Sequence, residues 1–285
     1  MHQHTDPTVA RTLTLTLMAM VAFAGNSLLC RMALRNTDVD PASFTTVRLL
    51  SGALVLWLIV RRRSGDQAMG GSWPSALALF TYAAGFSYAY VSLSAATGAL
   101  LLFGAVQATM ISYGLWHGER MARRQLAGLL CALAGLAGLL MPGISAPPWA
   151  GALLMLAAGV AWGIYSLRAK GAGNPTGATA GNFVRALPLA LLLSAATLPG
   201  SSLDGAGILY AMLSGALASG LGYAVWYTAL HGLSASSAAS VQLSVPVIAS
   251  IGGILLLGEP LTLRLLIASV AILGGIALVI ARRTV

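Results

Sequence analysis

The feature that most constrains the fold is a series of ten apolar stretches, each close to the roughly 20 residues that a helix needs to cross a bilayer core. Lipid offers the backbone no hydrogen-bond partner, so each stretch must be helical. The stretches do not alternate polar and apolar residues, which excludes a membrane β-barrel. They cover residues 12–33, 42–60, 74–93, 96–117, 123–141, 149–168, 178–198, 206–230, 235–257 and 263–281.

The composition agrees with a membrane location. Hydrophobic residues make up 58% of the chain and charged residues only 8%, whereas an average soluble domain carries roughly 25% charged residues. The net charge is +9, but the basic residues lie at the ends of the stretches and form no basic face for nucleic acid. The chain is therefore predicted to be an all-α integral membrane protein with ten transmembrane helices, and its macromolecular surroundings are the lipid bilayer, not nucleic acid.

The basic residues also predict the orientation. If the N-terminus is cytoplasmic, three lie in outside segments: Arg31, Arg35 and Arg264. Because cytoplasmic segments carry the excess of Lys and Arg, both termini are predicted to be cytoplasmic. The inside segments hold Arg11, Arg61, Arg62, Arg63, Arg120, Arg123, Arg124, Arg168, Lys170, Arg282 and Arg283.

The two halves of the chain repeat one another. The pair Gly118-Glu119, which follows one apolar stretch, recurs as Gly258-Glu259 after another. Further matches follow in register: Val47-Arg48-Leu49 with Val184-Arg185-Ala186, Gly85-Phe86 with Gly222-Tyr223, Tyr90 with Tyr227, and Ala95-Ala96-Thr97 with Ala235-Ser236-Ser237.

Each half then contains five helices, within residues 12–141 and 149–281, flanked by tails at 1–11 and 282–285. Five is an odd number, so the second half enters the membrane from the opposite side and the repeats are inverted. Inverted repeats are a common basis for alternating access, with substrate bound near the bilayer midplane.

This duplicated pattern of five plus five helices, with Arg48 and Arg185 in the second helix of each half and Gly-Glu after the fourth, resembles the EamA family of the drug/metabolite transporter superfamily. In length and character the chain is similar to the YddG-type exporters of aromatic and other amino acids. The resemblance covers residues 12–281. It implies an inner-membrane exporter of amino acids or similar small metabolites in a bacterial-type cell.

Other interpretations stay open at this stage. The same scaffold carries drugs and nucleotide sugars, although a nucleotide-sugar carrier should have more than two buried basic residues. A membrane enzyme would need a cluster of Asp, Glu or His, and a channel would need pore loops; neither pattern is visible. Cleavage of a signal peptide before Gly25 is a further alternative, and it would remove most of the first helix. The repeat argues that the first helix is retained, because its counterpart in the second half, near Trp162, stays in the membrane.

Aromatic residues predict where a substrate binds. Tyr82 and Phe86 lie on one helix face, and Tyr223 and Tyr227 lie on the face that the repeat relates to it. Such rings would suit apolar or aromatic side chains, and Trp162 is predicted to reach into the same cavity. The alternative is helix packing with an interfacial aromatic belt, to which Tyr90 is near enough to belong.

Polar residues within the apolar stretches complete the predicted site, since each needs a partner in protein or water. The substrate-binding candidates are Asn26, Gln107, Tyr165, Gln242 and Ser244, with helix-to-helix hydrogen bonding as the alternative for each. Pro246 is predicted to bend its helix more than the matching Val106 bends the first-half helix.

Charged residues are assigned structural roles. Arg48 and Arg185 are predicted to snorkel and to cap neighbouring helix ends, with attraction of an anionic substrate group as the alternative. In each Gly-Glu pair the Gly is predicted to end its helix and the Glu to favour the exposed amides at the start of the next turn, with a role as a gate as the alternative. No acidic residue lies at mid-membrane, so transport is predicted to be facilitated and not coupled to protons. No cofactor or metal is expected.

The stretches that hold the polar and aromatic residues are expected to line the cavity: 12–33, 74–93, 96–117, 149–168, 206–230 and 235–257. The stretches 123–141 and 263–281 consist mainly of Leu, Ala and Gly, and are expected to be peripheral packing or the contact surface of a homodimer.

Overall fold

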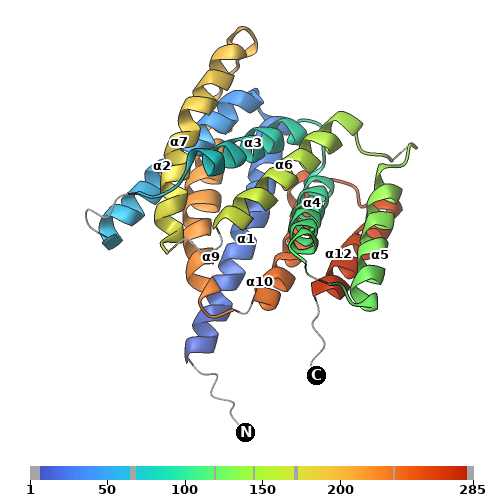
Figure 1. Ribbon diagram of the computed structural model, residues 1–285. Helices are drawn as coiled ribbons and strands as arrows, with labels where there is room; N and C mark the ends of the chain where they lie inside the picture. Colours follow the sequence, from blue (N-terminus) through green and yellow to red (C-terminus); the bar gives the residue numbers. More distant parts are fainter. Residues whose placement is uncertain are drawn as a thin grey trace.

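The computed structural model describes residues 7–64, 69–118, 120–143, 145–169, 173–233 and 235–280, which are helical apart from short connections (Figure 1). In chain order the elements are α1 (Pro7–Asn36), α2 (Pro41–Ser64), α3 (Trp73–Tyr90), α4 (Ala95–Trp116), α5 (Arg123–Leu140), α6 (Trp149–Ala169), α7 (Pro175–Ala196), the short η1 (Leu198–Gly200), α8 (Gly205–Leu213), η2 (Ser214–Leu221), α9 (Gly222–Leu230), α10 (Ala235–Gln242), α11 (Ser244–Leu257) and α12 (Leu263–Ile280).

Each of the ten predicted stretches coincides with one helix or with consecutive helices. The stretch 206–230 is one continuous rod in which α8 passes into the π-helical η2 and then into α9. The stretch 235–257 is divided between α10 and α11 at Leu243. The structure therefore agrees with the predicted helix positions and adds two local irregularities, both in the second half.

Within the described residues, nine helical rods are long and apolar enough to cross a membrane. The rod that falls short is α3, which is long enough but contains three tyrosines, two serines and a proline. One face of α3 is nevertheless deeply buried, including Tyr82, Phe86 and Tyr90. Its lower hydropathy thus reflects a helix placed inside the bundle. Because Tyr90 is fully buried, it does not belong to an interfacial belt.

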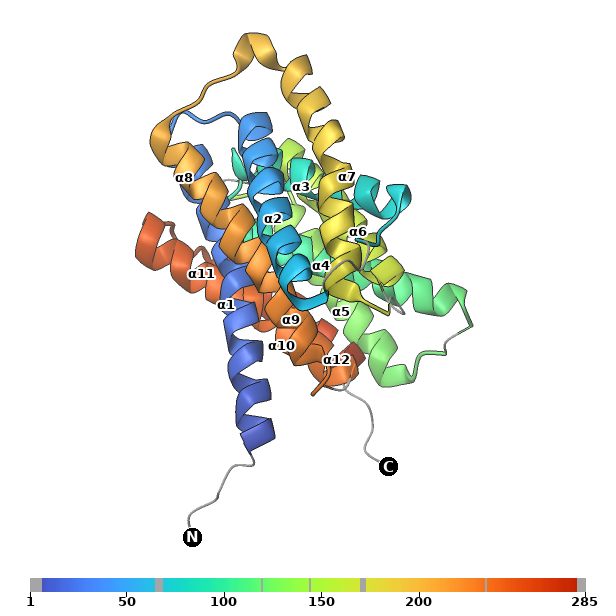
Figure 2. The same ribbon diagram turned by 90° about the vertical axis from the view of Figure 1, so that its left-hand side faces the viewer.

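Helices of the first half pack on their repeat counterparts. α2 contacts α7, α4 contacts α11, and α5 contacts α12, while α3 contacts α6 and α1 contacts α9. α5 and α12 lie side by side at one edge of the bundle, and α1 runs through its middle (Figures 1 and 2). Each of these contacts joins a helix of one half to a helix of the other. α2, α4 and α5 contact their counterparts in the sequence repeat, whereas α3 and α1 contact helices that are not their counterparts.

Glycines allow the closest of these contacts. A methyl group on Gly128 or Gly275 would collide with the backbone of the other residue, so α5 and α12 touch backbone to backbone. Gly159 and Gly163 of α6 lie in the same way against Ala105 and Thr109 of α4. Small residues provide this close approach in membranes, where lipid supplies no hydrophobic drive between helices.

The break at Leu243 has a local cause. Pro246 lacks an amide hydrogen, and its ring conflicts with the carbonyl four residues earlier, that of Gln242. α10 therefore ends at Gln242, whereas α4, which has Val106 at the matching position, runs unbroken from Ala95 to Trp116. The second-half helix is thus interrupted near Pro246, where the first-half helix is continuous.

Candidate functional site

A small cavity lies in the middle of the bundle, enclosed by the six segments that the sequence analysis assigned to a binding site. It holds about 20 Å³ of free space, which is enough for about one water molecule. α1, α3, α4, α6, the α8–η2–α9 rod and α10 all contribute to its wall. The lining residues are Phe23, Asn26, Ser27, Tyr82, Phe86, Leu102, Phe103, Trp162, Ala218, Tyr223 and Gln242.

Trp162 is the centre of an aromatic cluster at this cavity. Its ring stacks on that of Tyr223, with centroids 5.2 Å apart and an interplanar angle of 26°. It also lies 4.8 Å from the ring of Tyr82 and 5.2 Å from that of Tyr165. Helices α3, α6 and α9 thus meet through four rings, and the two repeats meet through Trp162. Ring pairs at these distances attract each other beyond the area they bury.

A polar wall faces the rings. The hydroxyl of Tyr82 accepts hydrogen bonds from Asn26 Nδ2 at 3.2 Å and from Arg48 Nη2 at 2.9 Å. Ser214 Oγ donates to Asn26 Oδ1 at 2.6 Å, and Arg48 Nε donates to Ser219 Oγ at 3.4 Å. All five residues are buried. Asn26 and Tyr82 carry this network to the cavity, while Arg48, Ser214 and Ser219 lie behind its lining.

The two serines of this wall come from η2. In a π-helix the hydrogen bonds span five residues, so side chains change direction relative to an ordinary helix. Ser214 and Ser219 stand at the first and sixth positions of η2 and reach α1 and α2 respectively. The sequence pattern of 206–230 indicates an ordinary helix and gave no signal of this irregularity.

Arg48 is the main residue that the sequence analysis placed wrongly. It was predicted to snorkel and to cap a helix end, but it is only 1% exposed and contacts side chains of α3 and η2. Arg185, its repeat counterpart, does bind backbone carbonyls: it donates to Gly70 O at 2.7 Å and to Gly181 O at 3.0 Å. The two repeat-related arginines therefore do different things.

Tyr165 and Tyr227 were predicted for the cavity but lie beside it. Thr179 accepts a hydrogen bond from the Tyr165 hydroxyl at 3.1 Å and is 3.0 Å from the Tyr227 hydroxyl. Tyr165 also lines a separate hollow of about 190 Å³ with Arg168 and Asn182. Each tyrosine is one helical turn from a cavity residue, which displaces it by about 5 Å along its helix.

Three other predicted residues do not line the cavity. Gln107 is buried within α4. Ser244 Oγ donates to the carbonyl of Val241 at 2.7 Å, across the break between α10 and α11. Pro246 is buried in the first turn of α11. Asn26, Tyr82, Phe86, Trp162, Tyr223 and Gln242 remain as the predicted residues that the structure brings together. No group of three metal-binding side chains occurs among the described residues.

Comparison with known proteins identifies the fold that builds this cavity. The model of the EamA-like transporter family matches the chain in two segments, residues 10–141 and 149–281. The chain belongs to this family. Members of the EamA-like family are membrane transporters, so the cavity is a place to look for a small-molecule substrate.

Individual relatives agree with the family assignment. The chain is 61% identical over 275 residues to the uncharacterized protein PA1977 of Pseudomonas aeruginosa, with 96% of both chains covered. It is 24% identical over 254 residues to the uncharacterized transporter YoaV of Bacillus subtilis, with 84% of this chain and 87% of that one covered. A solved crystal structure matches the fold with a TM-score of 0.67 at 22% identity, covering 93% of this chain and 98% of that one.

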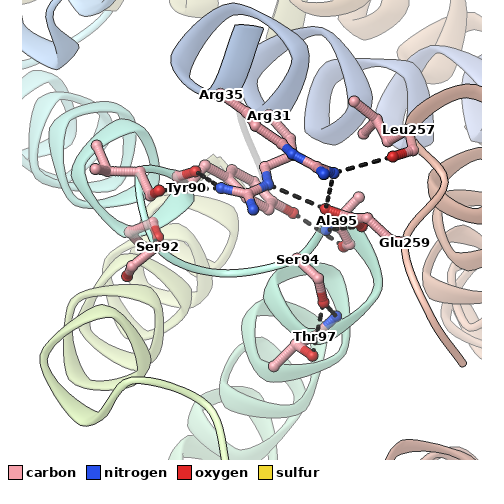
Figure 3. A network of polar contacts seen from close by, with 11 residues as sticks. Arg31, Arg35, Tyr90, Ser92, Ser94, Ala95, Thr97, Leu257 and Glu259 are labelled. Atoms are coloured by element: carbon pink, nitrogen blue, oxygen red, sulfur yellow. Dashed lines mark hydrogen bonds and ion pairs between the residues drawn. The ribbon is translucent and has the colours of Figure 1, made fainter. Parts of the chain in front are cut away.

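In this EamA-family chain the second Gly-Glu pair joins three parts of the bundle (Figure 3). Gly258 adopts a left-handed conformation, with φ of 61°, and ends α11 as predicted. Glu259 then accepts a hydrogen bond from the amide of Ala95 at the start of α4, at 2.8 Å, and pairs with Arg31 of α1 at 3.0 Å. The backbone amide that the Glu259 carboxylate binds thus lies at the start of α4, and not at the start of α12, the helix that follows Glu259 in the chain. Glu119, in the first pair, lies outside the described residues.

Arg31 extends this network to the end of α3. Its Nη1 donates to the carbonyls of Tyr90 and Val91 at 2.8 and 3.0 Å. Beside the network lies a hollow of about 350 Å³, lined in part by Arg31, Arg35 and Glu259. This hollow and the one that contains Tyr165 lie at opposite ends of α3, because the first reaches Ser92 and the second reaches Ser72.

Proposed function

We propose that this protein exports neutral amino acids, aromatic ones among them, across a bacterial-type inner membrane by alternating access. The observation that carries the proposal is the central cavity, which is lined by the rings of Tyr82, Phe86, Trp162 and Tyr223 and by the amide of Asn26. Asn26 and Arg48, which lies behind the lining, both donate to the Tyr82 hydroxyl. Binding sites for small molecules combine an apolar lining with a few fixed polar groups in this way.

The cavity offers complementary chemistry to each part of such a substrate. The aromatic faces suit an apolar side chain through stacking. The ammonium group finds no acidic residue among the lining residues, so the amide oxygens of Asn26 and Gln242, the hydroxyl of Ser27 and the faces of the rings receive it. A cation over an aromatic face is attracted by about 0.5–2 kcal/mol.

The topology proposed for this function has ten transmembrane helices in two inverted halves, with both termini cytoplasmic. The packing of α2 on α7, α4 on α11 and α5 on α12 supports it. The start of α1 and the end of α12 also lie toward the same end of the bundle (Figures 1 and 2), as an even number of crossings requires. α3 is included as the tenth span because both of its serines and two of its three tyrosines, Tyr82 and Tyr90, are buried in the bundle.

Alternating access accounts for the small size of the cavity. About 20 Å³ cannot hold an amino acid, so the structure corresponds to a closed arrangement. The Arg31–Glu259 network closes the proposed periplasmic end, next to one hollow, and the cluster around Tyr165 closes the cytoplasmic end, next to the other. Pro246, beside the break at Leu243, is the proposed hinge of the α10–α11 rod.

Transport in this account is driven by the substrate gradient. No described helix interior contains a carboxylate, because Asp38, Asp40, Asp204 and Glu259 lie in connections. Intramembrane proton relays ordinarily use such groups. Imposing a pH gradient on proteoliposomes is therefore expected to leave the initial uptake rate within twofold, and strict dependence on that gradient would contradict facilitated transport.

A counterflow assay tests the substrate class directly. Proteoliposomes preloaded with unlabelled phenylalanine, leucine, alanine or glutamate are diluted into labelled phenylalanine. We expect transient accumulation of the label with internal phenylalanine or leucine and little with internal glutamate, because the cavity lining is largely apolar and contains no charged residue. Liposomes without protein give the background. Failure of every amino acid, together with exchange of a drug or a nucleotide sugar, would contradict the proposal.

A further inference from the structure

Arg48 is enclosed in the bundle with part of its guanidinium unused. Nη2 donates to Tyr82 and Nε to Ser219, while the guanidinium carbon lies 5.1 Å from the ring centroid of Tyr82 and 4.9 Å from that of Phe86. Nη1 is buried and has no hydrogen-bond partner among the described residues. Buried polar groups nearly always have partners, so a free buried nitrogen on a charged group calls for an explanation.

The charge of Arg48 is also uncompensated by the neighbours that the structure describes. Its contacts are hydroxyls and aromatic faces, and no described acid is among them: Glu259 pairs with Arg31, Asp40 caps α2, Asp204 caps α8, and Asp38 is exposed. An unpaired buried charge is strongly unfavourable. Arg185 shows the structural solution at the matching place, since two backbone carbonyls accept from its Nη1.

Arg48 lies directly behind the cavity wall. Tyr82 and Phe86 line the cavity and also contact the guanidinium. The Tyr82 hydroxyl accepts from both Arg48 and Asn26, so its own proton stays available to a further acceptor. Nη1 and the Tyr82 hydroxyl are therefore two neighbouring donors that no described residue uses.

We propose that Arg48 is the carboxylate-binding residue of the transport site and makes one carboxylate an obligatory part of the substrate. This inference rests on the proposed function, and it names the group that the site selects. One guanidinium and one carboxylate cancel in charge, and Nη1 with the Tyr82 hydroxyl would supply the two donors that a carboxylate accepts. A phosphate carries up to two charges, and no basic residue besides Arg48 lies in or directly behind the described lining of the cavity.

The first test measures binding alone. Purified protein is titrated calorimetrically with phenylacetate, phenylacetamide and phenyl phosphate, which share one ring and differ in the polar group. We expect the wild-type protein to bind phenylacetate at least tenfold more tightly than the other two. Arg48→Gln should lose this preference, Arg48→Lys should keep part of it, and Arg185→Gln, the control from the second half, should keep all of it.

Protein stability separates this role from a structural one. Because no described acid neutralises the buried charge of Arg48, Arg48→Gln should not lower the melting temperature, whereas an arginine with a purely structural role would lower it when replaced. If Arg48→Gln does not fold, Arg48→Lys carries the comparison. Equal affinity of the wild-type protein for phenylacetate and phenylacetamide, unchanged phenylacetate binding by Arg48→Gln, or a preference for phenyl phosphate would each overturn the assignment.

The second test measures transport. Counterflow of labelled phenylalanine should be driven by internal phenylalanine but not by internal phenylalaninamide. Arg48→Gln should reduce the exchange at least tenfold. Arg48-dependent binding of phenylacetate without exchange of any amino acid would refute amino-acid export while supporting the carboxylate site. Exchange of phenylalanine that is equally fast in Arg48→Gln would refute the carboxylate site and leave amino-acid export standing.

Discussion

At the scale of single residues, Glu259 is held by two arginines that differ in how far they are buried. Arg31 lies 3.0 Å from the carboxylate and its side chain is 13% exposed, while Arg35 lies 3.9 Å away and is 42% exposed. Glu259 itself is buried at 6% exposure. Removing one partner of a buried pair is costly because the other charge stays behind, whereas an exposed pair contributes little.

Arg31→Gln should therefore destabilise the protein by about 3 kcal/mol, the lower end of the cost for a broken buried pair. Arg35→Gln should cost less than about 1 kcal/mol. Thermal unfolding in detergent, followed by intrinsic fluorescence, compares the two variants. Equal losses would show that burial of Arg31 does not determine the strength of this contact.

At the scale of helices, the contact between α5 and α12 depends on the absence of side chains at its centre. Adjacent glycines of α12 provide a matched comparison, since a methyl group on Gly275 meets the backbone of Gly128 while one on Gly274 meets nothing within 4 Å. Gly275→Ala should destabilise the protein by about 1–3 kcal/mol through overpacking. Gly274→Ala should be neutral, or stabilising by up to about 1 kcal/mol. Melting temperatures of both variants give the answer, and the reverse order would refute the backbone contact.

Two connections between helices hold one another through carboxylates. Asp40 Oδ1 accepts from the amides of Ala42 and Ser43 at the start of α2, and its Oδ2 accepts from Ser202 N. Asp204 accepts from Gly207 at the start of α8 and from the amide of Asp38. Partial burial acts to raise the pKa of Asp40, but its hydrogen bonds outweigh this and lower the pKa. The hydrogen bonds from Gly207 and Asp38 lower the pKa of Asp204.

This pair predicts an acid-sensitive end of the bundle. A carboxyl group whose pKa is lowered by folding stabilises the protein above its unfolded pKa of about 3.9, and this stabilisation is lost as the pH falls through the lower folded value. The melting temperature should therefore drop between pH 5 and pH 3. The double variant Asp40→Asn/Asp204→Asn should show a smaller drop, whereas Asp38→Asn, which keeps both caps, should follow the wild-type protein. An unchanged drop in the double variant would contradict this origin.

At the scale of the whole molecule, the sequence was sufficient for the positions of the helices and for the set of helices around the cavity. Apolar stretches of membrane-crossing length leave little choice of secondary structure. The repeat then placed polar and aromatic residues on corresponding helices, and Asn26, Tyr82, Phe86, Trp162, Tyr223 and Gln242 meet at the cavity.

Depth along a helix and contacts across the bundle were not predictable in the same way. Tyr165 and Tyr227 lie one turn away from the cavity because an apolar stretch does not define which turn faces a given neighbour. The role of Arg48 depends on η2, whose π-helical geometry places Ser219 against it. No local sequence signal marks that geometry, so the unpaired Nη1 emerged only from the packed structure.

Counterflow by two tryptophan variants of α6 tests the central claim, that this cavity is the transport path. Trp162 contacts three cavity or near-cavity rings, whereas Trp149, on the same helix, is 75% exposed. Trp162→Ala should reduce phenylalanine exchange at least tenfold, which corresponds to about 1.4 kcal/mol of lost interaction, and Trp149→Ala should stay within twofold of the wild-type rate. Wild-type exchange kinetics in a folded Trp162→Ala protein would contradict the account.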